Sequence, residues 1–246
     1  MHAVGIIPAR FAASRFPGKP LAQIAGKPML QWVIEGARSA KRLRELIVAT
    51  DDARIAEACA AFGARAVMTS AAHPTGTDRI AEVAAGLDAE VVVNVQGDEP
   101  LIEGFVIDAV VDALIAAPEC AMATAVHAAE PGAAADPNRV KVVLDRAGNA
   151  LYFSRSAIPF SLAPAKPAAL WQHVGLYAYR RAFLLEYVKL PQTPAELAEK
   201  LEQLRALEHG HAIRCAVIDG WRSAAVDVPA DVLRVEALLA ERGARA

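Results

Sequence analysis

The sequence of 246 residues has few cysteines, few aromatic residues and no long hydrophobic run. Its three cysteines are odd in number and far apart, which excludes a disulfide framework and a Cys-x-x-Cys zinc site. No stretch approaches the roughly 18 consecutive apolar residues that a membrane-spanning helix needs. Pro8 and Arg10 interrupt the apolar N-terminal segment, which is therefore unlike a signal peptide. We expect a soluble protein of the cytoplasm with no membrane partner.

An excess of charge of one sign is also missing. The chain has 26 Lys and Arg residues against 28 Asp and Glu, a formal net charge of -2. Proteins that bind nucleic acids usually present a strongly basic face, so we expect no nucleic-acid partner. Hydrophobic residues make up 54% of the chain. Ala and Val are spread along its length, which is typical of buried strands and Ala-rich helices.

The first half alternates short apolar runs with stretches of helical periodicity. Strands are predicted over residues 3–8, 46–50, 66–69 and 90–95, and helices over 28–40, 53–62, 77–86 and 103–116. Such alternation indicates crossover connections and a mostly parallel sheet. The run at 90–95 is apolar almost throughout, as in parallel strands that are buried on both faces.

The second half follows a different pattern. Apolar runs at 140–144 and 150–153, separated by Gly148-Asn149, predict an antiparallel hairpin. Further elements are predicted as strands at 173–179 and 213–218, one charged amphipathic helix at 195–207 and a closing helix at 230–242. The sequence therefore predicts an α/β fold in which a doubly wound, mostly parallel sheet is joined by a smaller antiparallel lobe.

Three cations lie on the short connection between the first strand and the first helix: Arg10, Arg15 and Lys19. Their mutual repulsion is relieved when an anion binds. A triphosphate is well suited, because its oxygens can accept paired hydrogen bonds from Arg guanidinium groups and a single contact from a Lys ammonium group. The alternative is a solvated basic loop. The connection lacks a Walker A motif, because Ala13 and Pro20 stand where Gly and Ser or Thr are required. No G-x-G-x-x-G follows the first strand, so P-loop ATPases and Rossmann dehydrogenases are both disfavoured.

Two carboxylates follow predicted strands. Asp98 lies in the segment 93–100, VNVQGDEP, directly after a buried strand, and Asp227 precedes the closing helix. Magnesium prefers one or two carboxylates together with phosphate oxygens and water, so the pair is a candidate metal site. The alternatives are a turn residue for Asp98 and a helix cap for Asp227.

Two polar pairs in the second half are candidates for binding a polyhydroxylated substrate. His173 and Tyr177 are four residues apart on a predicted strand and so share one face. Alternatively, both are core residues whose polar groups are hydrogen-bonded within the protein. Glu202 and Gln203 lie within the predicted helix at 195–207, where the alternative is a solvated face.

These segments, taken in order, resemble the family of 3-deoxy-manno-octulosonate cytidylyltransferases, also called CMP-Kdo synthetases. The segments that resemble the family cover residues 6–10, 14–21, 26–29, 48–51, 76–79, 93–100, 140–143, 152–155, 173–177, 201–205 and 226–227. The R-x-x-x-x-R-x-P-G-K and QGDEP segments are shared with other sugar cytidylyltransferases, whereas the later ones are more specific. The resemblance spans nearly the whole chain.

The resemblance implies a reaction and an organisation. The reaction transfers CMP from CTP to the anomeric hydroxyl of 3-deoxy-D-manno-octulosonate (Kdo), releases pyrophosphate and uses Mg²⁺; the product serves lipopolysaccharide synthesis. The implied fold is that of the nucleotide-diphospho-sugar transferases, in a protein that forms a homodimer. A single domain, 1–246, would comprise a nucleotide-binding half at about 1–130 and a sugar-binding and dimerisation lobe at about 131–220.

The resemblance also assigns roles to individual residues. Catalytic roles fall to Lys19, Asp98 and Asp227, and Asp98 and Asp227 would hold the metal. The nucleotide would be bound by Arg10, Ser14, Arg15, Lys19 and Arg79, and the sugar acid by Gln96, Arg155, His173, Tyr177, Glu202 and Gln203.

The chain departs from the family pattern in four places. Ala13 replaces a usual hydroxyl residue, the run 221–225 lacks the expected glycine, Val228 replaces a Thr, and the loop at 161–167 is shorter. Two other functions remain open: a cytidylyltransferase for another sugar acid (8-amino-Kdo or an acylneuraminate), and a nucleotide-binding regulatory module without catalysis. CTP binding without pyrophosphate release would favour the module.

Overall fold

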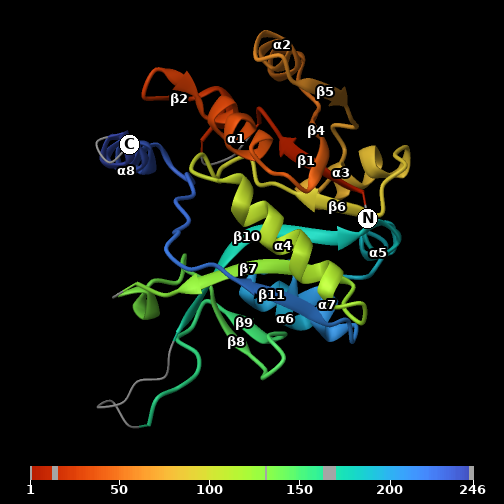
Figure 1. The fold of residues 1–246 in the computed structure, drawn as a ribbon, viewed down its shortest axis with the longest axis vertical. Coiled ribbons are helices and arrows are strands. Elements are labelled where there is room, and N and C mark those ends of the chain that lie inside the picture. The colour runs from red at the N-terminus through yellow and green to blue at the C-terminus, as the bar shows by residue number, and fades with distance from the viewer. Residues whose placement is uncertain (1, 13–15, 131, 163–169, 244–246) are drawn as a thin grey trace. The chain divides into compact units, whose positions relative to one another are not determined.

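A computed structural model describes residues 2–12, 16–130, 132–162 and 170–243 (Figure 1). The chain divides into two compact units: unit 1 comprises Met1–Asp108 and Ser223–Ala246, and unit 2 comprises Ala109–Arg222. The N-terminal and C-terminal segments therefore belong to the same unit. Within the described residues, no helix combines the length and the apolar character that crossing a membrane requires.

Unit 1 contains a parallel sheet, as the sequence predicts. Its strand order is β6 (Val91–Asn94), β1 (Ala3–Ala9), β4 (Leu43–Thr50) and β5 (Arg65–Met68), and each strand pairs in parallel with its neighbours. The central strands are buried: Ile6, Ile7 and Val92 are each 0% exposed, as in parallel strands that are covered on both faces. The chain runs outward from β1 to β4 and β5 and then returns to β6 on the other side of β1. Ligands of open parallel sheets bind at such a reversal point, beyond the carboxyl ends of the strands.

The helices of unit 1 begin where the sequence supplies capping residues. The Asp52 side chain accepts a hydrogen bond from the Arg54 amide at the start of α2, and Thr75 and Asp78 form a capping box at the start of α3. The elements of unit 1 besides its sheet are η1 (Lys19–Leu21), β2 (Gln23–Ile24), β3 (Lys27–Pro28), α1 (Met29–Arg38), α2 (Ala53–Ala61), α3 (Gly76–Ala85) and α8 (Pro229–Gly243). The helix α4 (Gly104–Ala116) contains the boundary between the units.

An apolar cluster joins the C-terminal segment to residues near the start of the chain. Ala224, Val226 and Val235 are buried together with Ile24 and Met29. The helix α8 consequently lies beside β2 (Figure 1). The segment before α8, which contains Asp227, therefore packs within unit 1.

Unit 2 is built around the strand β7 (Met122–Ala128), which the sequence analysis did not predict. It pairs in parallel with β11 (Ile213–Val217) and antiparallel with β10 (Trp171–Arg180). Its sequence, MATAVHA, has Ala at three of seven positions together with Thr and His, and it lacks a run of large apolar side chains. The predicted hairpin is confirmed as β8 (Lys141–Leu144) and β9 (Ala150–Ser154). The remaining elements include η2 (Ala133–Ala135) and α5 (Arg181–Tyr187).

The prediction of one helix over 195–207 is wrong. The structure has two short helices there, α6 (Pro194–Glu199) and α7 (Leu204–Glu208), separated at Lys200, whose φ is 54°. The buried carboxylate of Glu196 on α6 pairs with Arg205 on α7, at 2.5 Å between Oε1 and a guanidinium nitrogen. The charges therefore face each other across a turn, rather than along one helix. Glu202 and Gln203 lie in or beside that turn.

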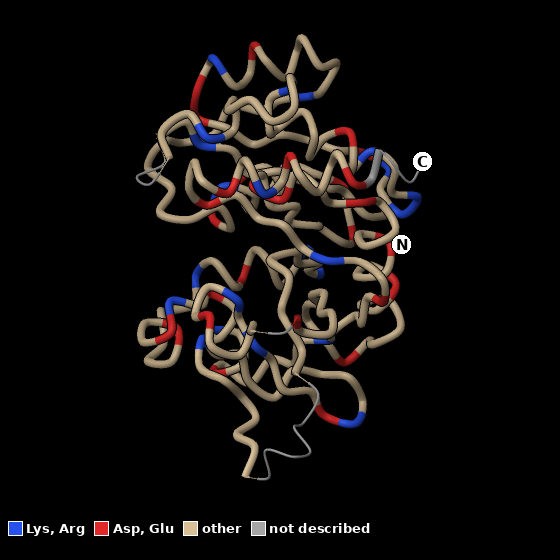
Figure 2. The backbone as a smooth tube through the Cα atoms, turned by 90° about the vertical axis from the view of Figure 1, so that its left-hand side faces the viewer, with Lys and Arg blue, Asp and Glu red and all other residues tan. Residues whose placement is uncertain are grey.

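Acidic and basic residues are interspersed along the traced backbone of each unit (Figure 2). This distribution agrees with the near-neutral net charge of the sequence. Long-range electrostatic attraction is therefore expected to matter less for this chain than charges at particular sites.

Candidate active site

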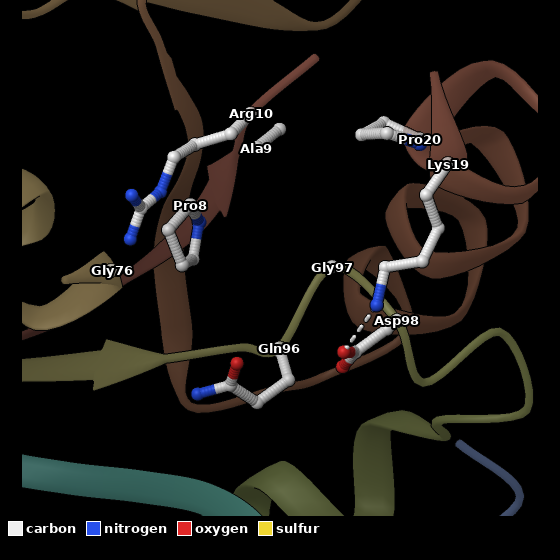
Figure 3. A pocket seen from close by; sticks show the side chains of 9 residues that line it. All are labelled: Pro8, Ala9, Arg10, Lys19, Pro20, Gly76, Gln96, Gly97 and Asp98. Atoms are coloured by element: carbon white, nitrogen blue, oxygen red, sulfur yellow. Dashed lines mark hydrogen bonds and ion pairs between the residues drawn. The ribbon is translucent and has the colours of Figure 1, made fainter. Parts of the chain in front are cut away.

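A pocket of about 170 Å³ opens in unit 1 at the carboxyl ends of β1 and β6 (Figure 3). This is the reversal point of the parallel sheet, where a ligand site is expected. The pocket is lined by Pro8, Ala9, Arg10, Lys19, Pro20, Gly76, Gln96, Gly97 and Asp98. It thus brings together residues from the basic loop and from the VNVQGDEP segment, which were singled out separately in the sequence.

Two glycines allow the backbone to form this pocket. A Cβ atom at Gly97 would lie 3.0 Å from the carbonyl oxygen of Pro8, so the turn after β6 approaches β1 too closely for a larger residue. Gly18 adopts a φ of +73°, and its amide donates to the carbonyl of Phe11 at 2.9 Å. That hydrogen bond joins Gly18 to Phe11 directly before Lys19, which lines the pocket.

The Lys19 ammonium group lies between two carboxylates. Its Nζ is 2.8 Å from Oδ2 of Asp98 and 4.0 Å from Oδ1 of Asp227, and it also donates to the carbonyl of Val226 at 3.0 Å. The first of these contacts is drawn in Figure 3. The lysine side chain is 16% exposed and those of the aspartates are 28% and 45% exposed. The site therefore offers a partly desolvated cation and two acceptors that remain open to solvent.

The two carboxylates fit a magnesium ion by their chemistry. Among the residues that the structure describes, no three His, Cys, Asp or Glu side chains form a metal-binding group. A pair of carboxylates is nevertheless sufficient for Mg²⁺, which completes its coordination with phosphate oxygens and water. Asp98 and Asp227 already converge on one cation, the Lys19 ammonium group.

Asp227 lies directly before α8, where another acidic side chain binds its backbone amide. The side chain of Asp231 accepts hydrogen bonds from the amides of Asp227 and Val228 at 2.8 and 3.0 Å. Asp231, in the first turn of α8, thus binds the two amides directly before the helix, and the Asp227 carboxylate lies 4.0 Å from the Lys19 ammonium nitrogen.

The other predicted nucleotide-binding residues differ in their placement. Arg10 lines the pocket, and its guanidinium donates to the carbonyl of Pro74 at 3.0 Å. Arg79 is 0% exposed and does not line the pocket; it pairs with Asp51 at 2.8 Å and donates to the hydroxyl of Thr69 at 2.5 Å. Ser14 and Arg15 lie outside the described residues.

Glu99 is a buried residue beside the site that the sequence analysis missed. Burial raises the pKa of its carboxyl group to about 7, and the nearby charge of Asp98 acts in the same direction, against hydrogen bonds from Ser223 and Ala224. A Glu before a Pro is an ordinary turn residue, so the sequence contains no signal for this burial. Only the packing of the 223–226 segment against the turn encloses it.

The predicted sugar-binding residues all lie in unit 2, apart from Gln96. His173 and Tyr177 share one face of β10, as predicted, with ring centroids 5.4 Å apart. His173 Nε2 is 3.0 Å from the hydroxyl of Thr124. Burial lowers the pKa of His173 to about 3 and raises the pKa of Tyr177 well above its usual value. Both side chains are therefore neutral near pH 7 and can exchange hydrogen bonds without a charge penalty.

The other three residues, Arg155, Glu202 and Gln203, lie in or contact the segment between α6 and α7. The Arg155 guanidinium donates to the carbonyls of Glu199 at 2.6 Å and Lys200 at 3.3 Å. The Tyr187 hydroxyl donates to the carbonyl of Glu202 at 2.5 Å. Gln203 is 4% exposed, and its Nε2 has no hydrogen-bond partner within the described part of the chain. A solvated face, the alternative considered for this pair, is thus wrong for Gln203.

This chain is similar to known cytidylyltransferases. A family model described as cytidylyltransferase matches residues 4–213. The chain is 52% identical to a 3-deoxy-manno-octulosonate cytidylyltransferase of Solibacter usitatus, over 96% of this chain and 93% of the relative. It is also 52% identical to one of Myxococcus xanthus, over 98% and 97%.

A solved structure resembles the whole chain. It is that of a CMP:2-keto-3-deoxy-manno-octonic acid synthetase complexed with CTP, which is 43% identical, with a TM-score of 0.92. The match covers 98% of this chain and 100% of the solved chain. A cytidylyltransferase from Leptospira borgpetersenii, 16% identical with a TM-score of 0.66, shares the fold.

Proposed function

This chain belongs to the 3-deoxy-manno-octulosonate cytidylyltransferases of the cytidylyltransferase family, and we propose that it transfers CMP from CTP to Kdo. The products are CMP-Kdo and pyrophosphate. The observation that supports this function most directly is the pocket at the β1 and β6 ends, where Lys19 meets Asp98 and Asp227. A relative of the same fold binds CTP, as its solved complex states.

In the proposed reaction the anomeric hydroxyl of the sugar acid attacks the α-phosphorus of CTP, and pyrophosphate leaves in line. Such transfers depend on positioning and on charge neutralisation, with little covalent work by the protein. The ammonium of Lys19 and the guanidinium of Arg10, both at the pocket, neutralise charge that accumulates on the leaving pyrophosphate. Gly97, which leaves the turn without a side chain, gives the phosphates access to the backbone.

We assign the metal to Asp98 and Asp227. A bound Mg²⁺ would polarise the α-phosphate and lower the pKa of the attacking hydroxyl. Within the chain, Lys19 balances the charge of the two carboxylates before substrates bind. This balance lets two acidic groups remain close together without strong repulsion.

The sugar acid is assigned to Gln96, Arg155, His173, Tyr177, Glu202 and Gln203. Arg155 suits the carboxylate of the substrate, because a guanidinium has five N–H donors and only three of them donate to carbonyls within the described residues. The neutral imidazole of His173 suits a hydroxyl group. The buried amide nitrogen of Gln203, which has no described partner, suits a further oxygen.

We also propose a homodimer that works in the cytoplasm. Exposed apolar side chains in unit 2, namely Leu151, Phe160 and Leu162, support an interface with a second copy. The three cysteines are free and buried, in keeping with a reducing compartment. Sedimentation equilibrium of the purified protein tests the dimer, and a monomer at micromolar concentration would contradict it.

Pyrophosphate release tests the function. The purified protein is incubated with Mg²⁺, CTP and Kdo, with CTP alone and UTP plus Kdo as controls. We expect release only with CTP and Kdo together, and its loss when a chelator is added. Release with 8-amino-Kdo or an acylneuraminate, but not with Kdo, would retain the reaction and replace the substrate. CTP binding without release for any sugar acid would indicate a regulatory module.

A further inference from the structure

Glu99 connects the turn that contains Asp98 to the segment that leads to Asp227. One carboxylate oxygen, Oε1, accepts a hydrogen bond from the Ser223 hydroxyl at 2.5 Å, and Oε2 accepts one from the Ala224 amide at 3.2 Å. Glu99 is only 5% exposed. A buried carboxyl group is costly unless it is hydrogen-bonded, so these two donors determine where the side chain is stable.

Two further contacts tie the same segments together. The Val226 amide donates to the carbonyl of Asp98 at 2.9 Å, and the Val226 carbonyl accepts from Lys19 at 3.0 Å. Ala224 and Val226 are also buried in the apolar cluster that contains Leu101. The segment 223–226 is therefore anchored to the turn at three residues, Ser223, Ala224 and Val226, directly before Asp227.

We propose that Glu99 is a positioning residue, which acts through Ser223 and Ala224 to hold the Asp227 carboxylate opposite that of Asp98 and so sets the affinity of the pair for a divalent cation. This inference rests on the proposed function, because it takes Asp98 and Asp227 as the metal-binding residues. Glu99 itself touches neither metal nor substrate in this proposal.

The residue at position 223 makes one of the two hydrogen bonds to Glu99 possible. The family resemblance led us to expect a glycine-bearing run before Asp227, but this chain has Ser223-Ala224-Ala225. A serine at position 223 supplies a hydroxyl donor that a glycine lacks. The hydrogen bond from the Ser223 hydroxyl to Glu99 therefore depends on the residue type at position 223, whereas the one from the Ala224 backbone amide does not.

The test compares Glu99→Gln and Ser223→Ala with two matched controls in unit 1. Asp108 also accepts two backbone hydrogen bonds, from the amides of Lys41 and Arg42 at 3.0 and 2.7 Å, so Asp108→Asn controls for the acid-to-amide change. Ser39 accepts from the Gly104 amide at 2.9 Å, so Ser39→Ala controls for the lost hydroxyl. Ser223→Thr keeps a hydroxyl and serves as the rescue variant.

Two quantities are measured in the full-length protein with saturating CTP. The first is Mn²⁺ binding, from the electron paramagnetic resonance signal of free Mn²⁺ without sugar acid. The second is the Mg²⁺ concentration for half-maximal pyrophosphate release with Kdo. We expect the dissociation constant for Mn²⁺ and the half-maximal Mg²⁺ concentration each to rise about three- to tenfold in Glu99→Gln and Ser223→Ala, an effect of the size of one hydrogen bond. At saturating Mg²⁺ the turnover should return to within about twofold of the unmodified protein.

The controls and the rescue variant should stay within about twofold of the unmodified protein. Unchanged Mn²⁺ binding and Mg²⁺ requirement in both test variants would overturn the positioning role. So would a lower turnover that added Mg²⁺ does not restore, because that is the result of a general structural defect. Asp98→Asn separates the two proposals: if it binds Mn²⁺ as tightly as the unmodified protein, the metal assignment itself fails, and the positioning role fails with it.

Discussion

The ammonium nitrogen of Lys19 lies 2.8 Å from Oδ2 of Asp98, although 79 positions separate the two residues in the chain. Asp227 approaches the same nitrogen from the other end of the sequence, at 4.0 Å. One ammonium group therefore lies within 4.0 Å of two acidic groups. This arrangement implies that the lysine and a metal ion compete for the same oxygen atoms.

Replacing Lys19 should move metal binding and catalysis in opposite directions. In Lys19→Met the two carboxylates lose their ammonium partner, so Mn²⁺ should bind more tightly in the absence of nucleotide. The value of kcat/KM for CTP should fall at least about a hundredfold, because a cation that stabilises the transition state is lost. Electron paramagnetic resonance and pyrophosphate release measure the two effects. Weaker Mn²⁺ binding in Lys19→Met would contradict the competition.

Removing the charge of Asp98 should cost more rate than nucleotide affinity. Asp98→Asn keeps the shape of the side chain but weakens an oxygen ligand for Mg²⁺. We expect the single-turnover rate to fall about a hundredfold or more, while the Kd for CTP changes by only a few fold. Rapid-quench kinetics and equilibrium dialysis measure these quantities. An Asp98→Asn enzyme with near-normal turnover would rule out the metal assignment.

Replacing Arg79 should destabilise the fold. Its guanidinium is fully buried and pairs with Asp51, so Arg79→Met leaves a carboxylate without its partner. We expect the free energy of unfolding to fall by about 3 kcal/mol. Urea denaturation of Arg79→Met, Asp51→Asn and the double variant measures the coupling between the two residues.

The same variants separate structure from nucleotide binding. Because Arg79 does not line the pocket, the Kd for CTP should change little in Arg79→Met under conditions where the protein stays folded. Isothermal titration with CTP provides that value. A large loss of CTP affinity at unchanged stability would instead support the direct nucleotide contact that the family resemblance implies.

The half-buried imidazole of His173 should make the folded state sensitive to mild acid. Its pKa is about 3 in the folded state and about 6.5 when exposed, so below pH 6.5 the unfolded state binds a proton that the folded state does not. Stability is therefore lost as the pH falls from 6.5 towards 3, by up to about 1.4 kcal/mol for each pH unit. This cost should disappear in His173→Gln.

Urea unfolding at pH 7 and pH 5 measures the difference. Between these values the unmodified protein should lose about 2 kcal/mol more stability than His173→Gln. The exposed His209 provides a control, and His209→Gln should behave as the unmodified protein does. Equal losses in the unmodified protein and in His173→Gln would show that this imidazole does not contribute.

Local patterns predicted the elements whose signals are local. The apolar runs at 3–8 and 90–95 correspond to β1 and β6. In parallel sheets, ligands bind beyond the carboxyl ends of the strands, and Lys19 and Asp98 both line the pocket at that end. The single helix over 195–207 failed, because both α6 and α7 have helical spacing and the turn at Lys200 leaves no mark in that spacing. The strand β7 was missed since small side chains give little periodic signal.

The sequence by itself determined the succession of strands and helices, the absence of a disulfide framework and the reaction class that its ordered motifs imply. Only the tertiary structure decided that Arg79 is buried against Asp51, that Asp231 binds the Asp227 amide, and that Glu99 is hydrogen-bonded to the 223–226 segment. The reason is physical. Periodicity and capping depend on neighbours within a few residues, whereas burial and the pairing of charges depend on side chains that approach one another from distant parts of the chain.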